Sequence, residues 1–305
     1  MDAGSAHRLG VALAWIQENA GCNVLVTCAG HEIVDAAPGV PANPADAAPQ
    51  IPDDSRPVVS LELEGCISRT EPWILVDLAV ASGGTVLLDT APCPSPDPDA
   101  LERLGQLTDG RVQVGTTSRK PGAALHLTHP PMSRRGIFRR GTSMPVVEHL
   151  SDDAQDRLVD SLRALGVGEV PGKAPALQLL VDGCIACGVC VKACPHDALE
   201  LGTASNRSTL VHHVDRCQGE RVCVAQCPSQ AISVIGHHDW QPVLAGRPLP
   251  LARLATTTCQ KCRSLIPQGQ KLCAACAARA EDPFGVHLPD HLRDKLPAKW
   301  RDRLG

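Results

Sequence analysis

Residues 1–125 alternate between helix-like and strand-like hydrophobic patterns. Apolar residues at helical spacing predict a helix over 7–19 and another over 70–82, the second beginning at a Thr70 cap. Short runs rich in β-branched residues predict strands over 23–27, 58–65 and 85–90. A stretch rich in Pro and Ala, 36–57, is expected to be a loop. Such alternation indicates an α/β domain built on a small parallel sheet.

The segment that follows, 126–175, reads as a linker. It carries a basic arm, SRRGIFRR (133–140), which we interpret as a surface arm or docking segment. An amphipathic helix is expected over 151–166, because Ser-Asp-Asp at its start and Gly166 at its end are typical helix boundaries. The linker leads into a cysteine-dense region at 176–236.

A loop rich in proline then leads to a second group of cysteines at 256–280 and to a tail at 281–305. Large apolar residues recur every four positions in the tail, which predicts a helix with a narrow docking stripe that Pro297 kinks. The stripe consists of Leu288, Leu292, Leu296, Trp300 and Leu304.

Two stretches of the cysteine-dense region align over nineteen residues without a gap, VDGCIACGVCVKACPHDAL (181–199) and VDRCQGERVCVAQCPSQAI (214–232). Three cysteines and one proline of the first stretch coincide with the same residue types in the second: Cys184 with Cys217, Cys190 with Cys223, Cys194 with Cys227, and Pro195 with Pro228. The fourth ligand position differs, because Cys187 falls opposite Glu220.

The first stretch resembles the C-x2-C-x2-C-x3-C-P run of dicluster bacterial ferredoxins, and the second is the same run with one thiolate replaced by a carboxylate. In that family the fourth cysteine of each run crosses to the other cluster. The resemblance therefore implies a 4Fe-4S cluster held by Cys184, Cys187, Cys190 and Cys227. A second cluster would use Cys194, Cys217 and Cys223, with Glu220 at its remaining corner. Short strands at Val181 and Val214 are implied as well, and the small or apolar residues that would pack against the clusters are Ala198, Leu199, Ala231 and Ile232.

Three interpretations of the second site stay open. The Glu220 corner lacks iron and the cluster is 3Fe-4S, or Glu220 or water binds a fourth iron, or the site is empty. A hard oxygen ligand binds cluster iron less firmly than a thiolate does, so the corner is expected to be labile. The two clusters should therefore differ in reduction potential.

The C-terminal cysteine group has the spacing Cys259-x2-Cys262, ten residues, Cys273-x2-Cys276. Two such pairs form a closed shell of four thiolates, which is typical of structural zinc. The group resembles a short zinc ribbon, and a rubredoxin-like iron site is the alternative.

Four further cysteines lie in the N-terminal domain. Cys28, Cys66 and Cys93 each follow a predicted parallel strand, at the sheet edge where α/β proteins bind ligands, whereas Cys22 precedes the first strand. The arrangement resembles hydrogenase delta-type and heterodisulfide-reductase-associated iron–sulfur subunits, which implies a third cluster or metal with His31 or Asp89 as fourth ligand. The chain lacks the adjacent-cysteine run of that family. The alternative is three small apolar cysteines in a core.

Composition narrows the functional classes. The 305-residue chain is 43% apolar, and its net charge of −4 gives no general reason to expect a nucleic-acid partner. No run reaches the roughly 18–20 apolar residues of a membrane span, and the N-terminus reads as an amphipathic helix and not as an export signal. Since eleven of the fifteen cysteines have metal-type spacing, we expect a protein of the reducing cytoplasm.

These patterns predict an electron-transfer protein. There is no dinucleotide fingerprint, phosphate-binding loop or nucleophile–base pair, so catalysis by this chain alone is not expected. Its expected partner is a redox enzyme of the hydrogenase, formate dehydrogenase or heterodisulfide reductase type, or another electron carrier. The alternative is a redox- or iron-sensing or assembly protein, in which the labile corner responds to oxidant and the zinc ribbon contacts a client.

Overall fold

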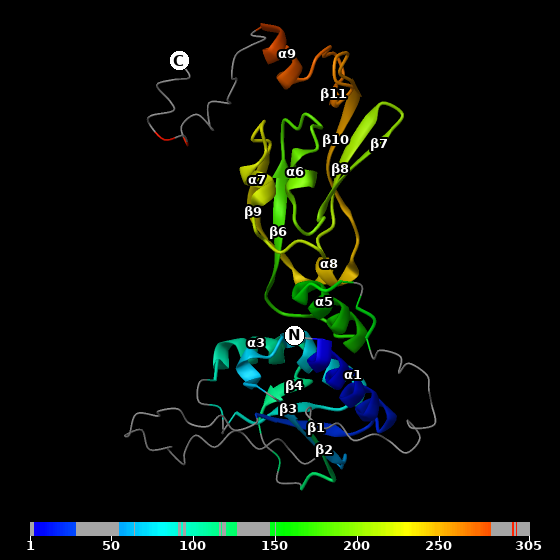
Figure 1. Cartoon of the computed structure of the whole chain (residues 1–305), viewed down its shortest axis with the longest axis vertical. Coiled ribbons are helices and arrows are strands. Elements are labelled where there is room, and N and C mark those ends of the chain that lie inside the picture. Colours follow the sequence, from blue (N-terminus) through cyan, green and yellow to red (C-terminus); the bar gives the residue numbers. More distant parts are fainter. Residues whose placement is uncertain are drawn as a thin grey trace. The chain divides into compact units, whose positions relative to one another are not determined.

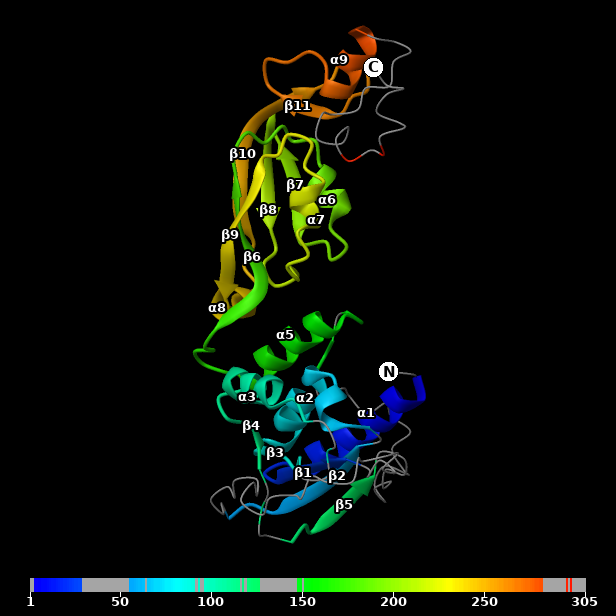
Figure 2. The ribbon, with the colours of Figure 1, turned by 90° about the vertical axis from the view of Figure 1, so that its left-hand side faces the viewer.

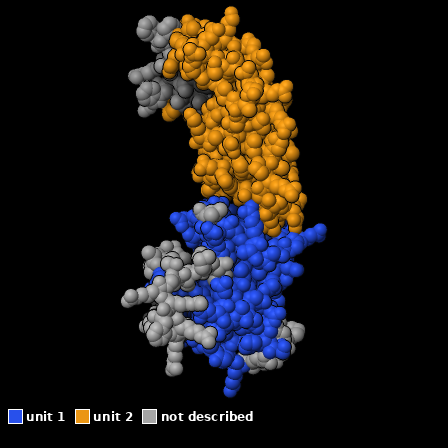
Figure 3. All heavy atoms as spheres, turned by 90° about the vertical axis from the view of Figure 1, so that its right-hand side faces the viewer, with its two compact units in different colours: residues 1–172 blue, residues 173–305 orange. Residues whose placement is uncertain are grey.

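The computed structural model of the 305-residue chain describes residues 3–28, 55–63, 65–90, 93, 96–115, 117, 120–126, 147–149, 151–281, 295 and 297. The basic arm, almost all of the tail and His31 lie outside these residues. The chain forms two compact units, Met1–Gly172 and Lys173–Gly305, which Figure 3 colours blue and orange. Within the described segments, no helix has both the length and the apolar character needed to cross a bilayer.

The first unit contains a five-stranded sheet in the order β4-β3-β1-β2-β5, in which every neighbouring pair is parallel (Figure 1). Its strands are β1 (Asn23–Cys28), β2 (Val58–Leu63), β3 (Val86–Leu88), β4 (Val112–Val114) and β5 (Ala123–His126). The central strand alternates buried and half-buried positions, and Val24 and Val26 are fully buried. The predicted parallel sheet is confirmed, although the sequence patterns indicated neither β4 nor β5.

In the described residues of this unit, four α-helices and one 3₁₀-helix accompany the sheet. They are α1 (Ala3–Glu18), η2 (Ile67–Arg69), α2 (Pro72–Ser82), α3 (Pro98–Leu107) and α5 (Ala154–Leu165). The predicted Thr70 cap of α2 is wrong, because Thr70 closes η2 and Glu71 precedes the helix. A proline at the first helical position explains this start, since proline lacks the N–H that would go unsatisfied there.

The predicted helix α5 is confirmed, although it begins at Ala154 and not at Ser151, and it stops at Gly166 as expected. The Asp153 side chain accepts hydrogen bonds from two backbone N–H groups of the first turn, and Gly166 ends the helix in the left-handed conformation. The helix packs on α2, where the Ser161 hydroxyl donates a 2.6 Å hydrogen bond to the buried carboxylate of Asp77. Figure 2 shows the resulting order of layers, with α2 between the sheet and α5. The helix thus belongs to the first compact unit.

The second unit is built from antiparallel strands. β6 (Lys173–Val181) pairs with β9 (Ile232–Asp239), and a four-stranded sheet has the order β11-β10-β8-β7. The strands of that sheet are β7 (Leu199–Ala204), β8 (Arg207–His212), β10 (Leu249–Thr258) and β11 (Leu265–Pro267). The helices that the structure describes in this unit are short: α6 (Val189–Ala193), α7 (Val222–Ala225), α8 (Trp240–Ala245) and α9 (Ala274–Glu281). Helices α6 and α7 contact each other, and they belong to the two aligned stretches.

Two expectations for this unit are wrong. Val214 does not form a strand but lies buried in a turn, because β8 ends at His212. The proline-rich loop before the last cysteines is largely replaced by α8 and β10. Strand β10 tolerates Pro250 because its register with β8 shifts between Pro250 and Ala252, and an irregularity of this kind accommodates a residue without a backbone donor.

Candidate metal centres

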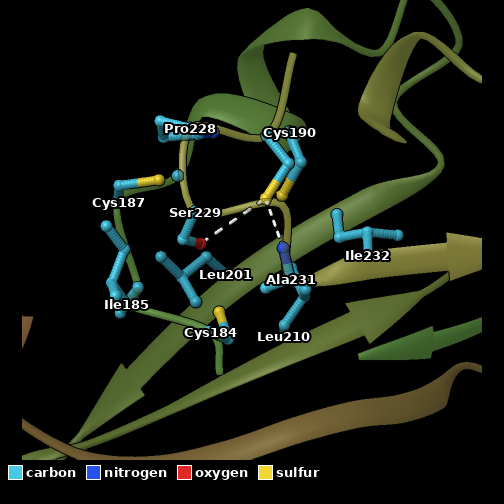
Figure 4. Close-up of a pocket in the computed structure, with 13 residues that line it drawn as sticks. Cys184, Ile185, Cys187, Cys190, Leu201, Leu210, Pro228, Ser229, Ala231 and Ile232 are labelled. Atoms are coloured by element: carbon cyan, nitrogen blue, oxygen red, sulfur yellow. Dashed lines mark hydrogen bonds between the residues drawn. The ribbon is translucent and has the colours of Figure 1, made fainter. Parts of the chain in front are cut away.

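One pocket in the second unit is lined by four cysteines. Cys184, Cys187 and Cys190 come from the first aligned stretch, and Cys227 comes from the second. Figure 4 shows the sulfur atoms of Cys184, Cys187 and Cys190 directed toward the same space. This grouping is the one that crossed ligation requires, since the fourth cysteine of the second run joins the first three of the other.

The rest of the lining is largely apolar. Ala231 and Ile232 border the pocket, and both are buried, as are Ala198 and Leu199 at the matching positions of the first stretch. The hairpin β7–β8 adds Leu201 and Leu210, which the sequence patterns did not assign to the site. An apolar shell of this kind keeps water from thiolate-bound iron and tunes its reduction potential.

Hydrogen bonds and charges at this pocket suit thiolates bound to a cation. The Ala231 N–H donates to Cys227 Sγ at 3.3 Å, and the Ser229 hydroxyl lies 3.6 Å from the same sulfur (dashed lines in Figure 4). Burial, followed by the charges of Cys187, Cys184 and Cys227, raises the pKa of the Cys190 thiol to about 12. Four thiolates so close together repel one another until a cation neutralises them, so the residues fit an iron–sulfur cluster.

This geometry agrees with a comparison of the sequence with known families. Residues 183–231 match the family model of a 4Fe-4S dicluster domain. The match includes all seven cysteines of the two aligned stretches and the hairpin between them, and we refer to residues 183–231 as the dicluster domain. No curated protein matches the chain.

The second site of the dicluster domain contains three cysteines. The thiol of Cys223 interacts electrostatically with those of Cys217 and Cys194, and burial is the largest cause that raises its pKa. Backbone N–H groups donate to two of these sulfurs, from Ala198 to Cys194 Sγ at 3.4 Å and from Leu177 to Cys217 Sγ at 3.5 Å. The structure thus gathers three thiols on the second site.

Glu220 lies at the loop position that corresponds to Cys187. Its carboxylate Oε1 is 3.3 Å from Nε2 of His196, and the glutamate side chain is half-exposed. His196 follows the Cys194-Pro195 pair, so one contact joins the loops of both runs. The sequence patterns did not single out His196, although its place two residues after a ligand cysteine was visible.

The two aligned stretches share three left-handed positions despite the ligand difference, although Gly183 (72°) has no left-handed counterpart at Arg216. Three matched pairs of positions have positive φ: Ala186 (55°) with Gly219 (84°), Gly188 (70°) with Arg221 (61°), and Asp197 (50°) with Gln230 (51°). Left-handed φ costs a residue with a side chain roughly 1–2 kcal/mol, so the repetition of this conformation in both loops reflects a shared constraint. The second loop therefore keeps the shape of a cluster-binding loop.

The C-terminal cysteines Cys259, Cys262, Cys273 and Cys276 form a tight knuckle, in which their sulfur atoms all lie within 4.8 Å of one another. Backbone N–H groups of Cys262 and Cys273 lower the pKa of the Cys259 thiol to about 6. Four sulfurs at this separation fit a single tetrahedral ion. The knuckle continues the sheet of the dicluster domain, because β10 pairs with both β8 and β11.

The N-terminal cysteines Cys28, Cys66 and Cys93 also converge. Their sulfur atoms lie within 4.8 Å of one another, and all three residues are buried. Cys22 is buried too but precedes β1 and does not belong to this group. Among the described residues, no fourth ligand joins the three, and this includes Asp89.

Proposed function

We propose that this chain is an iron–sulfur electron relay that transfers electrons between a redox donor and a redox enzyme. The observation that supports this most strongly is the pocket in which Cys184, Cys187, Cys190 and Cys227 converge, beside a second loop of the same backbone conformation. Bound clusters of this type supply one-electron redox chemistry. The protein residues set their potential through thiolate ligation, N–H···S hydrogen bonds and exclusion of water.

The two sites are proposed to carry different clusters. The first has four thiolates and suits a 4Fe-4S cluster. The second has Cys194, Cys217 and Cys223, and Glu220 occupies the loop position at which the first site has its fourth thiolate. That corner binds its iron weakly or is vacant, so the second cluster is a 3Fe-4S cluster or a 4Fe-4S cluster with one labile iron.

Electron exchange with a partner is proposed to occur at the first cluster. Cys187 is exposed, whereas the other ligand cysteines of this pocket are buried or half-buried. Val189, two residues along the chain, is an exposed large hydrophobic residue with 36% of its surface accessible. The partner would be a hydrogenase-like, formate-dehydrogenase-like or heterodisulfide-reductase-like enzyme, or another electron carrier of the cytoplasm.

The C-terminal knuckle is proposed to bind zinc in a structural role. Its four thiols leave no ligand position for a substrate. Metal analysis of the Cys262→Ser chain should show the loss of one zinc per chain without a change in iron content. If iron with the visible absorption of a rubredoxin-like centre is lost instead, the zinc assignment fails.

The relay is tested by voltammetry of the anaerobically purified full chain. We expect two reversible one-electron couples at different potentials and the same oligomeric state in the oxidised and reduced protein. Cys187→Ser should alter one couple only, whereas Cys22→Ser, a buried cysteine outside the dicluster domain, should alter neither.

The alternative role as a sensor or assembly protein predicts a different outcome. Oxidation would then convert the second cluster and switch the binding of a client protein. A redox-dependent change in oligomeric state or client binding, measured by size-exclusion chromatography and pull-down with both redox forms, would overturn the relay.

A further inference from the structure

Three buried cysteines meet at one edge of the parallel sheet in the first unit. Cys28 ends β1, Cys66 follows β2 and precedes η2, and Cys93 follows β3. These three strands are neighbours in the sheet, with β1 between β3 and β2. Because parallel strands carry their carboxyl ends to a common edge, segments 27 to 65 residues apart in sequence bring their thiols together there.

The distances between the three sulfur atoms indicate what they could bind. All three atoms lie within 4.8 Å of one another. With zinc–sulfur bonds of about 2.3 Å, thiolates on one tetrahedral ion are separated by about 3.8 Å. The ligands of a 4Fe-4S cluster bind different irons, so their sulfurs lie farther apart.

The dicluster domain and the knuckle provide an internal comparison. In the part of the chain that the structure describes, only the knuckle and the N-terminal trio gather three or more ligand atoms within 4.8 Å. The cysteines of the dicluster pocket are spread too widely to meet this criterion. The trio therefore resembles the site that suits a single ion and not the site that suits a cluster.

The contacts within the trio show how its sulfurs would respond to an ion. The Ile67 N–H donates to Cys28 Sγ at 3.2 Å, and a hydrogen bond at 3.0 Å joins the thiols of Cys66 and Cys93, which would separate by about 0.8 Å when both bind one tetrahedral ion. Each of the three residues is at most 8% exposed. Three thiolates buried together would repel one another strongly without a cation, and soft sulfur ligands select zinc or copper(I).

We propose that Cys28, Cys66 and Cys93 bind a single thiophilic metal ion, zinc(II) or copper(I), at the carboxyl edge of the parallel sheet. Binding displaces the thiol protons to solvent, and no electrons are transferred. Three protein ligands leave a position open on a tetrahedral ion, as in zinc sites that bind a fourth ligand from outside the protein. This site is separate from the dicluster domain and the knuckle, so it does not depend on the electron-relay proposal.

The test uses full-length chain purified anaerobically in the Cys259→Ser/Cys262→Ser background, which removes the knuckle as a second thiolate site. After incubation with zinc chloride or with copper(I), and removal of loosely bound metal, metal analysis should find one zinc or one copper per chain in addition to the cluster iron. X-ray absorption at the edge of that metal should give a first shell of three sulfurs. Whether zinc or copper gives this result decides which of the two metals the site binds.

Matched serine variants locate the ion. Cys66→Ser and Cys93→Ser should each lower the occupancy of the additional ion at least tenfold at a fixed free-metal concentration. Cys22→Ser removes a buried cysteine of the same unit that lies outside the trio. This variant should still bind one additional metal ion per chain. The X-ray absorption measurement leaves the trio intact, so it remains decisive if a serine variant fails to fold.

Five results would overturn the proposal, and four of these concern the trio directly. They are a parent chain without a stoichiometric additional ion, a first shell without sulfur, equal loss of metal in Cys22→Ser and Cys66→Ser, and a disulfide between Cys66 and Cys93 in anaerobic protein. A multi-iron signature that persists after the ligand cysteines of the dicluster domain are replaced would also contradict a single-ion site.

Discussion

Two loops of the dicluster domain differ at one predicted ligand position. In the first loop, the third residue after Cys184 is Cys187, which carries a thiol. In the loop that begins at Cys217, the matched residue is Glu220, whose carboxylate lies beside His196. The backbone around these two positions adopts the same left-handed conformations at three matched places. The comparison teaches that this loop conformation accommodates either a thiol or a carboxylate at the third position after its first cysteine, so backbone geometry and side-chain chemistry are separate properties of this domain.

The largest expected effect comes from replacing the last cysteine of each run, which we propose crosses to the cluster of the other loop. Cys227 belongs to the second run but lines the pocket of the first site, so Cys227→Ser should remove the first cluster, roughly four irons per chain. The cluster beside Glu220 should keep its electron paramagnetic resonance signal. Iron analysis and spectra of the same anaerobic sample measure both quantities.

The matched control for Cys227→Ser is Cys194→Ser, which should leave the first cluster in place and remove the second. If Cys227→Ser instead removes the signal that depends on Glu220, the ligands are not crossed and the assignment of the two sites is wrong.

A smaller effect is expected from the backbone of the second loop. Gly219 has φ 84°, and a Cβ at this position would lie 2.7 Å from the carbonyl oxygen of Pro175. Gly219→Ala should therefore lower the free energy of unfolding by at least about 1–2 kcal/mol and lower the occupancy of the second cluster. Anaerobic urea unfolding and iron analysis measure the two effects.

The matched position in the first loop already carries an alanine, Ala186, with φ 55°. Ala186→Gly should change the free energy of unfolding by less than about 1 kcal/mol, because glycine adopts this conformation without strain. Equal effects of the two substitutions would contradict the view that the Pro175 carbonyl constrains only the second loop.

Acid should lower the free energy of unfolding of the dicluster domain through a histidine that belongs to neither cysteine loop. His212, on the hairpin between them, is 1% exposed; burial, and then the charges of His238 and His213, lower its pKa to about 4, while Asp215 opposes this shift. Because the unfolded chain takes up this proton near pH 6.5, stability is complete above that pH and falls toward pH 4, by up to about 3 kcal/mol. Urea unfolding between pH 7.5 and 4.5 measures the loss.

His212→Leu should flatten this pH dependence, since neither ring nitrogen has a hydrogen-bond partner among the described residues. A pH dependence unchanged in this variant would assign the acid sensitivity to other groups, such as the thiolates.

Cysteine spacing predicted which four cysteines line the first pocket, because the ferredoxin pattern involves only a short loop and one crossing residue. Local signals also predicted β1 and the two caps of α5. Asp153 caps the first turn of that helix and Gly166 ends its last turn, so neither signal depends on residues far away in sequence. Strand β10 was missed, since it is stabilised by pairing with β8, far away in sequence, and because Pro250 within it and Pro248 just before it resemble the prolines of a loop.

The contributions of the hairpin and of His196 were missed for a similar reason. Leu201 and Leu210 reach the first pocket only through antiparallel pairing, and His196 reaches Glu220 only when both loops are folded. The convergence of Cys28, Cys66 and Cys93 was predictable from parallel-sheet topology, whereas the short distances between their sulfurs required the structure.

The most direct test of the difference between the two loops compares the wild type with Glu220→Cys by electron paramagnetic resonance, in anaerobic protein and after mild oxidation. The wild type should show a 3Fe-4S signal as isolated or after oxidation, because its second site lacks a fourth thiolate. Glu220→Cys should suppress that signal and give two 4Fe-4S signals on reduction. Two cubane clusters that withstand oxidation equally in both proteins would contradict this account.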